Sequence, residues 1–391
     1  MSLPCQRQHF DIPSSITYLN CAYMGPLSHH VLAAGVEGLG RKARPWKIGS
    51  EDFFEDVEVA RELFARVIGG DSEGVALVPS VSYGIACAAR NLPVPAGSEI
   101  VVLAEQFPSN IYIWQDLARR HGACLRTVGR PQDGDWTREV IAALGPNTAM
   151  AALPNCHWTD GTLVDLEKVG TELRRIGASL VVDGCQSVGA MPFDVETVQP
   201  DFLVTGSYKW LLGPYSQGFL WVAPRWRQGK PLEQNWIARA NSRDFAAVAN
   251  YTDRFAPGAR RFDVGEVSNF GLLPATLAAL EQCLEWGVET IHKTLSQHTQ
   301  VIAEKAEHLG LGVAPPENRS GHLIGLRLGG RDPRALATDL ARARVFVSVR
   351  GDSVRVSPHV YNDSKDIERF IDVLARALAS GTDPQPAMAT P

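Results

Sequence analysis

The sequence predicts an α/β protein with a large domain built on a mostly parallel mixed sheet, followed by a smaller α+β C-terminal domain. Between residues 73 and 177, short apolar runs alternate repeatedly with segments of helical period, which is typical of strand–helix units in a parallel sheet. The apolar runs are continuous, as expected when helices cover both faces of the sheet. Near residue 272 the pattern changes to a long helical stretch, which marks the start of the smaller domain.

The elements of the large domain follow from these runs in order. We expect strands at 73–80, 98–105, 124–129, 148–155, 178–184, 201–207 and 218–224. The intervening helices are expected at 81–92, 109–122, 137–145 and 166–177. These assignments rest on β-branched or apolar runs for the strands and on helical periodicity for the helices.

The C-terminal part should contain a helical stretch at 272–310 and then shorter elements. We expect strands at 322–330, 345–351 and 352–358, and helices at 332–343 and 365–379. We assign residues 21–271 to the large domain, and residues 1–20 with 272–391 to the small one.

Composition excludes several classes of protein. Hydrophobic residues make up 45% of the 391-residue chain and charged residues 21%, which is ordinary for a globular protein. A net charge of −5 lacks the positive excess that is typical of nucleic-acid-binding proteins. No apolar run approaches the ~18 residues of a membrane span. The first residues lack the basic and apolar regions of a signal peptide. We therefore expect neither a nucleic-acid nor a membrane partner.

The seven cysteines point to a reducing, cytoplasmic setting. Their number is odd and no CxxC pair occurs, so neither a disulfide framework nor a thiolate metal site is favoured. We expect no metal.

Chemistry-bearing residues follow four of the predicted strands. Ligands of open α/β sheets bind beyond the carboxyl ends of strands, where this chain places 80–84, 106–110, 183–187 and 207–209. Each group has a commoner structural role when taken alone: a helix N-cap serine, a core aromatic, a turn aspartate or a surface lysine. Together they favour a binding site, because they supply all the groups that one cofactor requires.

That cofactor is pyridoxal 5′-phosphate (PLP). Its aldehyde bonds to a lysine amine, for which Lys209 is placed after a strand. Its pyridine nitrogen stays protonated beside a carboxylate such as Asp183, and its phosphate suits the helix start at Val81 and Ser82. Apolar neighbours of Lys209 disfavour the charged ammonium and so favour the nucleophilic amine.

The segment "LVVDGCQSVGAMPFDV…DFLVTGSYKWLLGP" resembles the class V aminotransferase family of fold-type I PLP enzymes. That family includes cysteine desulfurases, kynureninases and isopenicillin-N-epimerase-like proteins, and the resemblance covers nearly the whole chain. It implies that Lys209 is the catalytic lysine and that Asp183 pairs with the pyridine nitrogen. The further residues it implies for cofactor binding are Val81, Ser82, Phe107, Trp158, Gln186, Ser207 and Tyr208.

The resemblance also implies that a second subunit contributes residues to the site and that further residues bind the substrate. Trp236 and the pair Ser268 and Asn269 resemble segments that family members lend to a neighbouring subunit, so we expect a homodimer with the site at its interface. Arg355 resembles the arginine that binds the substrate α-carboxylate, and Asn110 is assigned to the substrate as well.

Departures from the desulfurase pattern bear on the reaction. Desulfurases carry a nucleophilic cysteine on a loop before the segment that here reads "VRVSPHVYN", whereas this chain has no cysteine after Cys283 and no room for a long loop. A persulfide mechanism is therefore not expected. Trp158 stands near positions where desulfurases have Asn and kynureninases Tyr, which predicts a bulky pocket.

The leading hypothesis is an enzyme in which Lys209 removes the Cα proton of an amino acid and a group then leaves Cβ, which would make it a lyase. Three alternatives stay open: an aminotransferase, an epimerase and a kynureninase-like hydrolase. A PLP-binding protein without turnover is the remaining hypothesis, and a complete set of Lys209, Asp183 and Arg355 argues against it.

Overall fold

The structure is a computed structural model that describes residues 2–380. Within them, the central sheet has seven strands in the order β2-β8-β7-β6-β5-β3-β4, and β8 alone runs antiparallel to its neighbours. The bounds are β2 (Val75–Val78), β3 (Glu99–Leu103), β4 (Cys124–Val128), β5 (Thr148–Pro154), β6 (Ser179–Asp183), β7 (Phe202–Gly206) and β8 (Gly218–Val222). All seven predicted strands are confirmed, each somewhat shorter than expected.

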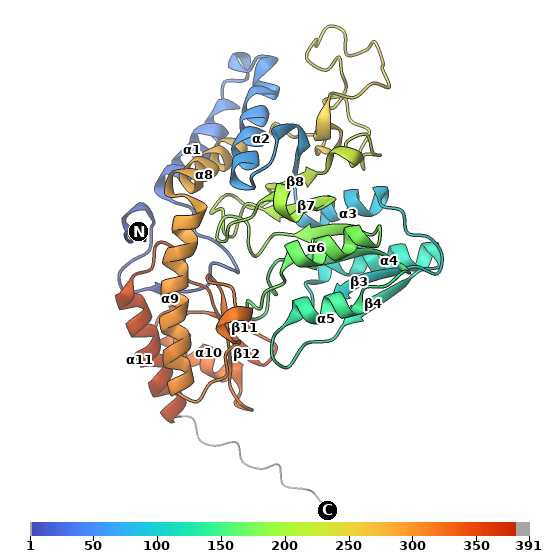
Figure 1. Ribbon diagram of the computed structural model, residues 1–391. Coiled ribbons are helices and arrows are strands. Elements are labelled where there is room, and N and C mark those ends of the chain that lie inside the picture. Colours follow the sequence, from blue (N-terminus) through green and yellow to red (C-terminus); the bar gives the residue numbers. More distant parts are fainter. Residues whose placement is uncertain (1, 381–391) are drawn as a thin grey trace, which may run out of the picture.

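Helices cover both faces of this sheet (Figure 1). Side chains alternate along a strand, so Ile100 and Val102 of β3 join one apolar core, while Val101 and Leu103 join the other. The first core includes residues of α3 (Val81–Asn91) and α4 (Tyr112–His121), and the second those of α2 (Glu55–Val67), α5 (Trp136–Ala143) and α6 (Leu166–Arg175). This double coverage explains the continuous apolar runs in the sequence.

The C-terminal part begins with α8 (Leu273–Trp286) and α9 (Val288–His308). The predicted single helical stretch is divided at Gly287, whose φ of +74° is a left-handed value that suits glycine. A three-stranded antiparallel sheet follows, in the order β11-β12-β9. Its strands are β9 (Ile324–Arg327), β11 (Ser348–Arg350) and β12 (Ser353–Val356), and α10 (Pro333–Arg342) and α11 (Ser364–Ser380) pack beside it.

The N-terminal segment joins the C-terminal part. Strand β1 (Thr17–Tyr18) pairs in parallel with β10 (Val345–Phe346), so the predicted strand 345–351 is in fact two short strands, β10 and β11. Helices α1 (His29–Arg41) and α2 pack against α8, and no element was expected there from the sequence. The proposed boundaries at 20/21 and 271/272 stay a prediction, and the ends of the small domain, residue 1 and 381–391, lie outside the described residues.

Residues 227–257 form an irregular segment between two short 3₁₀ helices, Pro224–Trp226 and Gly258–Phe262. In Figure 1 much of this segment, coloured yellow, projects away from the body of the molecule. Of the helices in residues 2–380, none combines the length and apolar character required to cross a membrane.

Candidate active site

A cavity of about 270 Å³ lies at the carboxyl ends of the central strands. It collects the residues that follow β2, β3, β5, β6 and β7, as expected for a parallel sheet. The lining residues are Pro79, Ser80, Val81, Ser82, Gln106, Phe107, Ser109, Pro154, Cys156, Trp158, Asp183, Cys185, Gln186, Gly206, Tyr208, Lys209, Tyr215, Ser216 and Gln217. Most of the residues predicted to bind the cofactor are among them.

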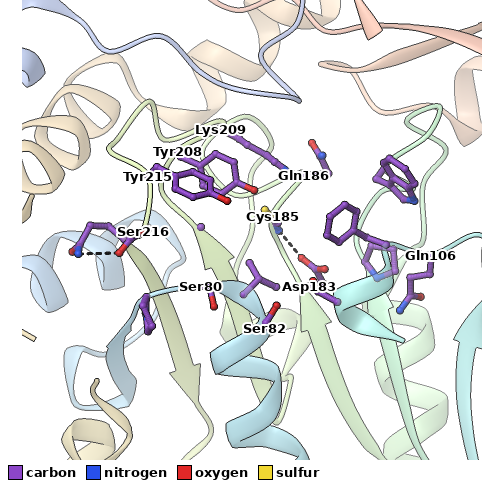
Figure 2. A pocket seen from close by; sticks show the side chains of 18 of the residues that line it. Ser80, Ser82, Gln106, Asp183, Cys185, Gln186, Tyr208, Lys209, Tyr215 and Ser216 are labelled. Atoms are coloured by element: carbon purple, nitrogen blue, oxygen red, sulfur yellow. Dashed lines mark hydrogen bonds between the residues drawn. The ribbon is translucent and has the colours of Figure 1, made fainter. Parts of the chain in front are cut away.

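Asp183 is the last residue of β6 and lies 7% exposed in the cavity wall (Figure 2). Its Oδ1 accepts a hydrogen bond of 3.0 Å from the backbone N–H of Cys185. Burial raises the pKa of this carboxyl, while that N–H and the charge of Lys209 act in the opposite direction. A buried carboxylate with one hydrogen bond is stabilised by a positive partner inside the cavity.

Lys209 follows β7 by three residues and is also 7% exposed. Its Nζ lies 5.6 Å from the ring centre of Phe107 and 5.4 Å from that of Tyr208, and no carboxylate pairs with it within residues 2–380. The backbone around it is held by the N-terminal segment, because Gly25 N–H donates to the Tyr208 carbonyl at 2.9 Å. A Cβ at position 25 would lie 2.2 Å from the Lys209 carbonyl oxygen, so this close approach requires glycine.

The start of α3 forms another wall of the cavity, where Figure 2 shows Ser80 and Ser82. Ser80 is the N-cap, and its Oγ accepts from the N–H of Tyr83 at 3.2 Å. Among the described residues, the N–H groups of Val81 and Ser82 have no acceptor, as is usual in a first helical turn. These two N–H groups and the Ser82 hydroxyl therefore offer donors to an anionic group such as a phosphate.

Two aromatic side chains border the cavity on the side of β3 and β5. The Phe107 ring, 40% exposed, meets the Trp158 ring edge-on, with ring centres 5.4 Å apart. Trp158 is fixed by a 2.7 Å hydrogen bond from its Nε1 to the carbonyl of Glu105. Phe107 thus offers a flat face to a planar ligand, and Trp158 adds the bulk expected at this position.

Gln186 is held firmly at the base of the cavity. Its Nε2 donates to the Ala22 carbonyl at 3.1 Å, and its Oε1 accepts from Trp210 Nε1 at 3.0 Å. Its second N–H remains open to a ligand, which fits the predicted place beside the ring hydroxyl of the cofactor.

Arg355 lies on β12 and is 1% exposed. Its Nη1 donates to the Trp158 carbonyl at 2.7 Å, while its Nε and Nη2 are buried and have no partner among residues 2–380. Burial lowers the pKa of this guanidinium to about 9, and the nearby charge of Arg350 adds to the effect. The open Nε–Nη2 edge matches the two oxygens of a carboxylate.

Arg355 borders a second cavity, of about 320 Å³, that adjoins the first. The two cavities share Phe107, Trp158, Gln186, Tyr208, Lys209 and Tyr215. The predicted substrate arginine and the predicted cofactor lysine therefore face one continuous site.

Asn110 and Ser207, two predicted site residues close to the cavities in sequence, line neither of them. Asn110 is fully buried, and its Oδ1 accepts from Trp114 Nε1 at 2.8 Å, so its side chain turns into α4. We therefore no longer assign it a substrate contact. The Ser207 hydroxyl donates to the carbonyls of Pro214 and Gln217, which makes it a brace for the loop after Lys209.

Trp236 and Asn269 also lie apart from the cavities of their own chain. Trp236 is 43% exposed and packs against Phe53 and Phe245. The Asn269 Oδ1 accepts from the N–H groups of Gly271 and Leu272 at the start of α8. Their predicted role at a neighbouring subunit stays a prediction.

Sequence reasoning missed several lining residues, among them Ala22, Tyr23 and Met24 of the N-terminal segment, which border the second cavity. Tyr215, Ser216 and Gln217 lie in the turn before β8, and their nearness to Lys209 in the sequence was the available signal. Arg350 lines the second cavity together with Arg355. Its signal was the segment "SVRGDSVRV", in which two short strands flank a Gly-Asp turn.

Comparison with known proteins agrees with this site. The family model described as aminotransferase class-V matches residues 40–370. Isopenicillin N epimerase of Streptomyces clavuligerus is 29% identical over 332 residues, covering 81% of this chain and 83% of that protein. Kynureninase of Geobacillus thermodenitrificans is 24% identical over 402 residues, covering 95% and 90%.

Solved structures show the same fold. A mutant of C-DES with glycine covalently linked to its PLP cofactor superposes with a TM-score of 0.85 at 22% identity, covering 95% of this chain and 99% of that one. A complex described as the cystine C–S lyase C-DES with its product cysteine persulfide gives a TM-score of 0.83 at 22% identity, covering 93% and 98%.

The residues of the cavity fit pyridoxal 5′-phosphate. In the described part of the chain, the buried carboxylate of Asp183 has a free oxygen for a protonated ring nitrogen, and the Lys209 amine has no carboxylate partner. The N–H groups of Val81 and Ser82 are unclaimed donors for a phosphate. PLP is therefore the cofactor. Phe107 and Gln186 line the same cavity, and their contact with the cofactor stays a prediction.

Proposed function

Because the chain belongs to the aminotransferase class-V family, we propose that this PLP-dependent enzyme removes the Cα proton of an amino acid and then eliminates a group from Cβ. The observation that carries the proposal is the continuous site in which the Lys209 amine and the unpaired edge of Arg355 face the same space. An amino acid bound there presents its α-carboxylate to the arginine and its Cα to the lysine. We further propose that it acts in the cytoplasm as a homodimer.

Each residue of the site has a separate role in the proposed reaction. Arg355 fixes the carboxylate and so orients the bonds at Cα. The Lys209 amine takes the proton from Cα and holds it for return or for the leaving group. When bound, PLP supplies a conjugated ring that accepts the electron pair left at Cα, and Asp183 keeps the ring nitrogen protonated. Phe107 and Trp158 border the site and give it an apolar wall.

Elimination without an enzyme persulfide is supported by the cysteines near the site. Cys156 and Cys185 are the two that line the first cavity in residues 2–380. Burial raises the pKa of Cys156 to about 12, which disfavours the thiolate that a persulfide mechanism needs. The similarity to the cystine C–S lyase C-DES agrees with side-chain cleavage.

The test is a screen of L-amino acids in D₂O with the holoenzyme. Deuterium should appear at Cα, detected by NMR, and pyruvate and ammonia should form without a keto-acid acceptor. Absence of both for every amino acid would contradict the proposal. Formation of a D-isomer instead would favour an epimerase, the second candidate, which the similarity to isopenicillin N epimerase supports. Dependence on a keto acid would indicate an aminotransferase, and release of anthranilate from kynurenine a hydrolase.

Replacement of Arg355 should weaken every productive substrate. Arg355→Gln removes a charge-assisted bidentate contact, so kcat/KM should fall by roughly 30-fold to several thousandfold, from the ~2–5 kcal/mol of such a contact. The cofactor's visible absorbance should be unchanged, because Arg355 borders the second cavity and not the first. Steady-state kinetics and absorbance spectra check this.

Cys156→Ser and Cys185→Ser are the matched comparison for Arg355→Gln. Both cysteines line the first cavity, yet each serine variant should retain turnover within a few-fold if no thiolate attacks the substrate. Loss of turnover in a serine variant, together with survival of Arg355→Gln, would instead indicate thiol chemistry.

A shared site should be visible in mixed dimers. If Asn269 serves the partner's cofactor, Lys209→Ala and Asn269→Ala chains should each be impaired and should complement one another. A random 1:1 mixture of two-fold dimers should regain roughly a quarter of the wild-type sites, because half the dimers are mixed and each has one complete site. Light scattering gives the oligomeric state, and failure to complement would place Asn269 outside the partner's site.

A further inference from the structure

Arg350 lies beside Arg355 on one face of the C-terminal hairpin. The antiparallel register pairs Ser348 with Arg355 and Arg350 with Ser353. Residues paired across a ladder share a face, and so do residues two apart on a strand, so both arginines stand on the face of Ser348. The tight turn between β11 and β12 begins at Gly351, whose φ is +57°.

Both guanidinium groups line the second cavity, where Arg355 is fully buried and Arg350 is half-buried. Arg350 donates from Nη1 to the carbonyl of Val349 at 2.6 Å, as Arg355 does to that of Trp158. The Nε of Arg350 is buried without a partner, as are the Nε and Nη2 of Arg355. Each arginine therefore keeps its Nε edge open, which is the edge that binds a carboxylate side-on.

Nothing within residues 2–380 neutralises these two charges. Neither arginine has a carboxylate partner there, and burial lowers the pKa of both. Arg350 is held in place by the Trp158 ring, whose centre lies 5.3 Å from its Cζ. Arg355 is a buried cation and Arg350 a half-buried one, so a ligand that supplies two negative groups would relieve the cost of placing both in one cavity. The α-carboxylate of an amino acid provides only one of them.

We propose that Arg350 is a specificity-determining residue that binds a second carboxylate, at the far end of the substrate side chain. The substrate class is then amino acids with a distal carboxylate, and neutral or aromatic side chains are disfavoured. The assignment of the first carboxylate to Arg355 rests on the proposed function. Trp158 positions both arginines, one through its carbonyl and the other through its ring.

The test uses ligands without an amino group, because they bind without reacting. Isothermal titration calorimetry on the holoenzyme would compare succinate, glutarate and adipate, each with its own monoamide. For the diacid of matching length, binding should be roughly tenfold to a hundredfold tighter than for its monoamide, the usual worth of a charged hydrogen bond. Equal affinities in all three pairs would overturn the proposal.

Two variants separate a ligand contact from a structural role. Arg350→Gln should abolish the preference for the diacid while the affinity for the monoamide stays the same, and Arg350→Lys should retain part of the preference. Arg355→Gln should weaken both ligands. If Arg350→Gln weakens diacid and monoamide equally, Arg350 only supports Trp158 and the inference is wrong.

A substrate pair extends the test to turnover. S-carboxymethyl-L-cysteine and its neutral amide, S-carbamoylmethyl-L-cysteine, lose the same kind of thiolate from Cβ and differ in the distal charge. The acid should be preferred in kcat/KM by the wild type but not by Arg350→Gln. A preference for diacids without deuterium exchange at Cα would support the second carboxylate site and contradict the proposed reaction. Deuterium exchange at Cα without a preference for diacids would support the proposed reaction and contradict the second carboxylate site.

Discussion

Lys209→Ala should lose turnover by at least about a thousandfold, because one amine supplies both the covalent attachment of the cofactor and the proton transfer at Cα. The side chain is 7% exposed and its Nζ faces the cavity between Phe107 and Tyr208. Borohydride reduction of the wild type should fix the cofactor to the peptide that contains Lys209, which peptide mass spectrometry detects. The variant should hold cofactor only through non-covalent contacts.

The matched control for this prediction is Lys168→Ala. Lys168 is an exposed lysine whose Nζ pairs with Asp165 at 2.8 Å, and it lines neither cavity. Its variant should keep full turnover and the same labelled peptide. Added small amines should restore part of the turnover of Lys209→Ala, since they replace the missing base. Label on a different lysine, or near-normal turnover in Lys209→Ala, would contradict the assignment.

Asp183→Asn should reduce turnover by roughly 10²- to 10³-fold while cofactor occupancy stays near that of the wild type. The carboxylate is expected to keep the pyridine nitrogen protonated, and removing one preorganised electrostatic partner costs about this factor. Asparagine retains an oxygen that can accept from the Cys185 N–H, so the turn after β6 is preserved. Turnover and cofactor content, the latter measured after release in denaturant, check the prediction.

The contrast between occupancy and turnover makes the Asp183 prediction specific. The N–H groups of Val81 and Ser82 and the ring of Phe107 remain as contacts for the cofactor. Loss of occupancy in parallel with turnover would indicate that Asp183 serves mainly to hold the cofactor. Normal turnover would mean that it is only a residue of the turn.

The fold of the large domain could be predicted from the sequence because its signals are local. The continuous apolar runs became strands buried on both faces, whereas the more polar run 124–128 became the exposed edge strand β4. Asp183 and Lys209 could be placed together for the same reason, since Asp183 ends β6 and Lys209 follows β7, which is its neighbour in the sheet. Parallel strands bring their carboxyl ends to one edge, so strand position alone brought these residues together.

Other features depended on contacts between distant parts of the chain, which no local pattern records. Asn110 follows β3 as the pattern required, yet its amide turns to Trp114. Ser207 adjoins the lysine motif, but its hydroxyl braces the loop that returns to β8. In both cases a buried side-chain oxygen found a protein partner nearby, because leaving it unpaired is costly, although the Nδ2 of Asn110 has no partner within residues 2–380.

The sequence by itself determined the family of the chain, its strands and the two residues at the centre of the cavity. Only the tertiary structure decided how that cavity is closed and what else faces it. Gln186 is fixed by Ala22, 164 residues away, and Arg355 by Trp158, 197 residues away. The pairing of Arg350 with Arg355 depends on hairpin register. Side chains so far apart in sequence meet only when the C-terminal part and the N-terminal segment pack against the large sheet, and that packing places both arginines in one cavity.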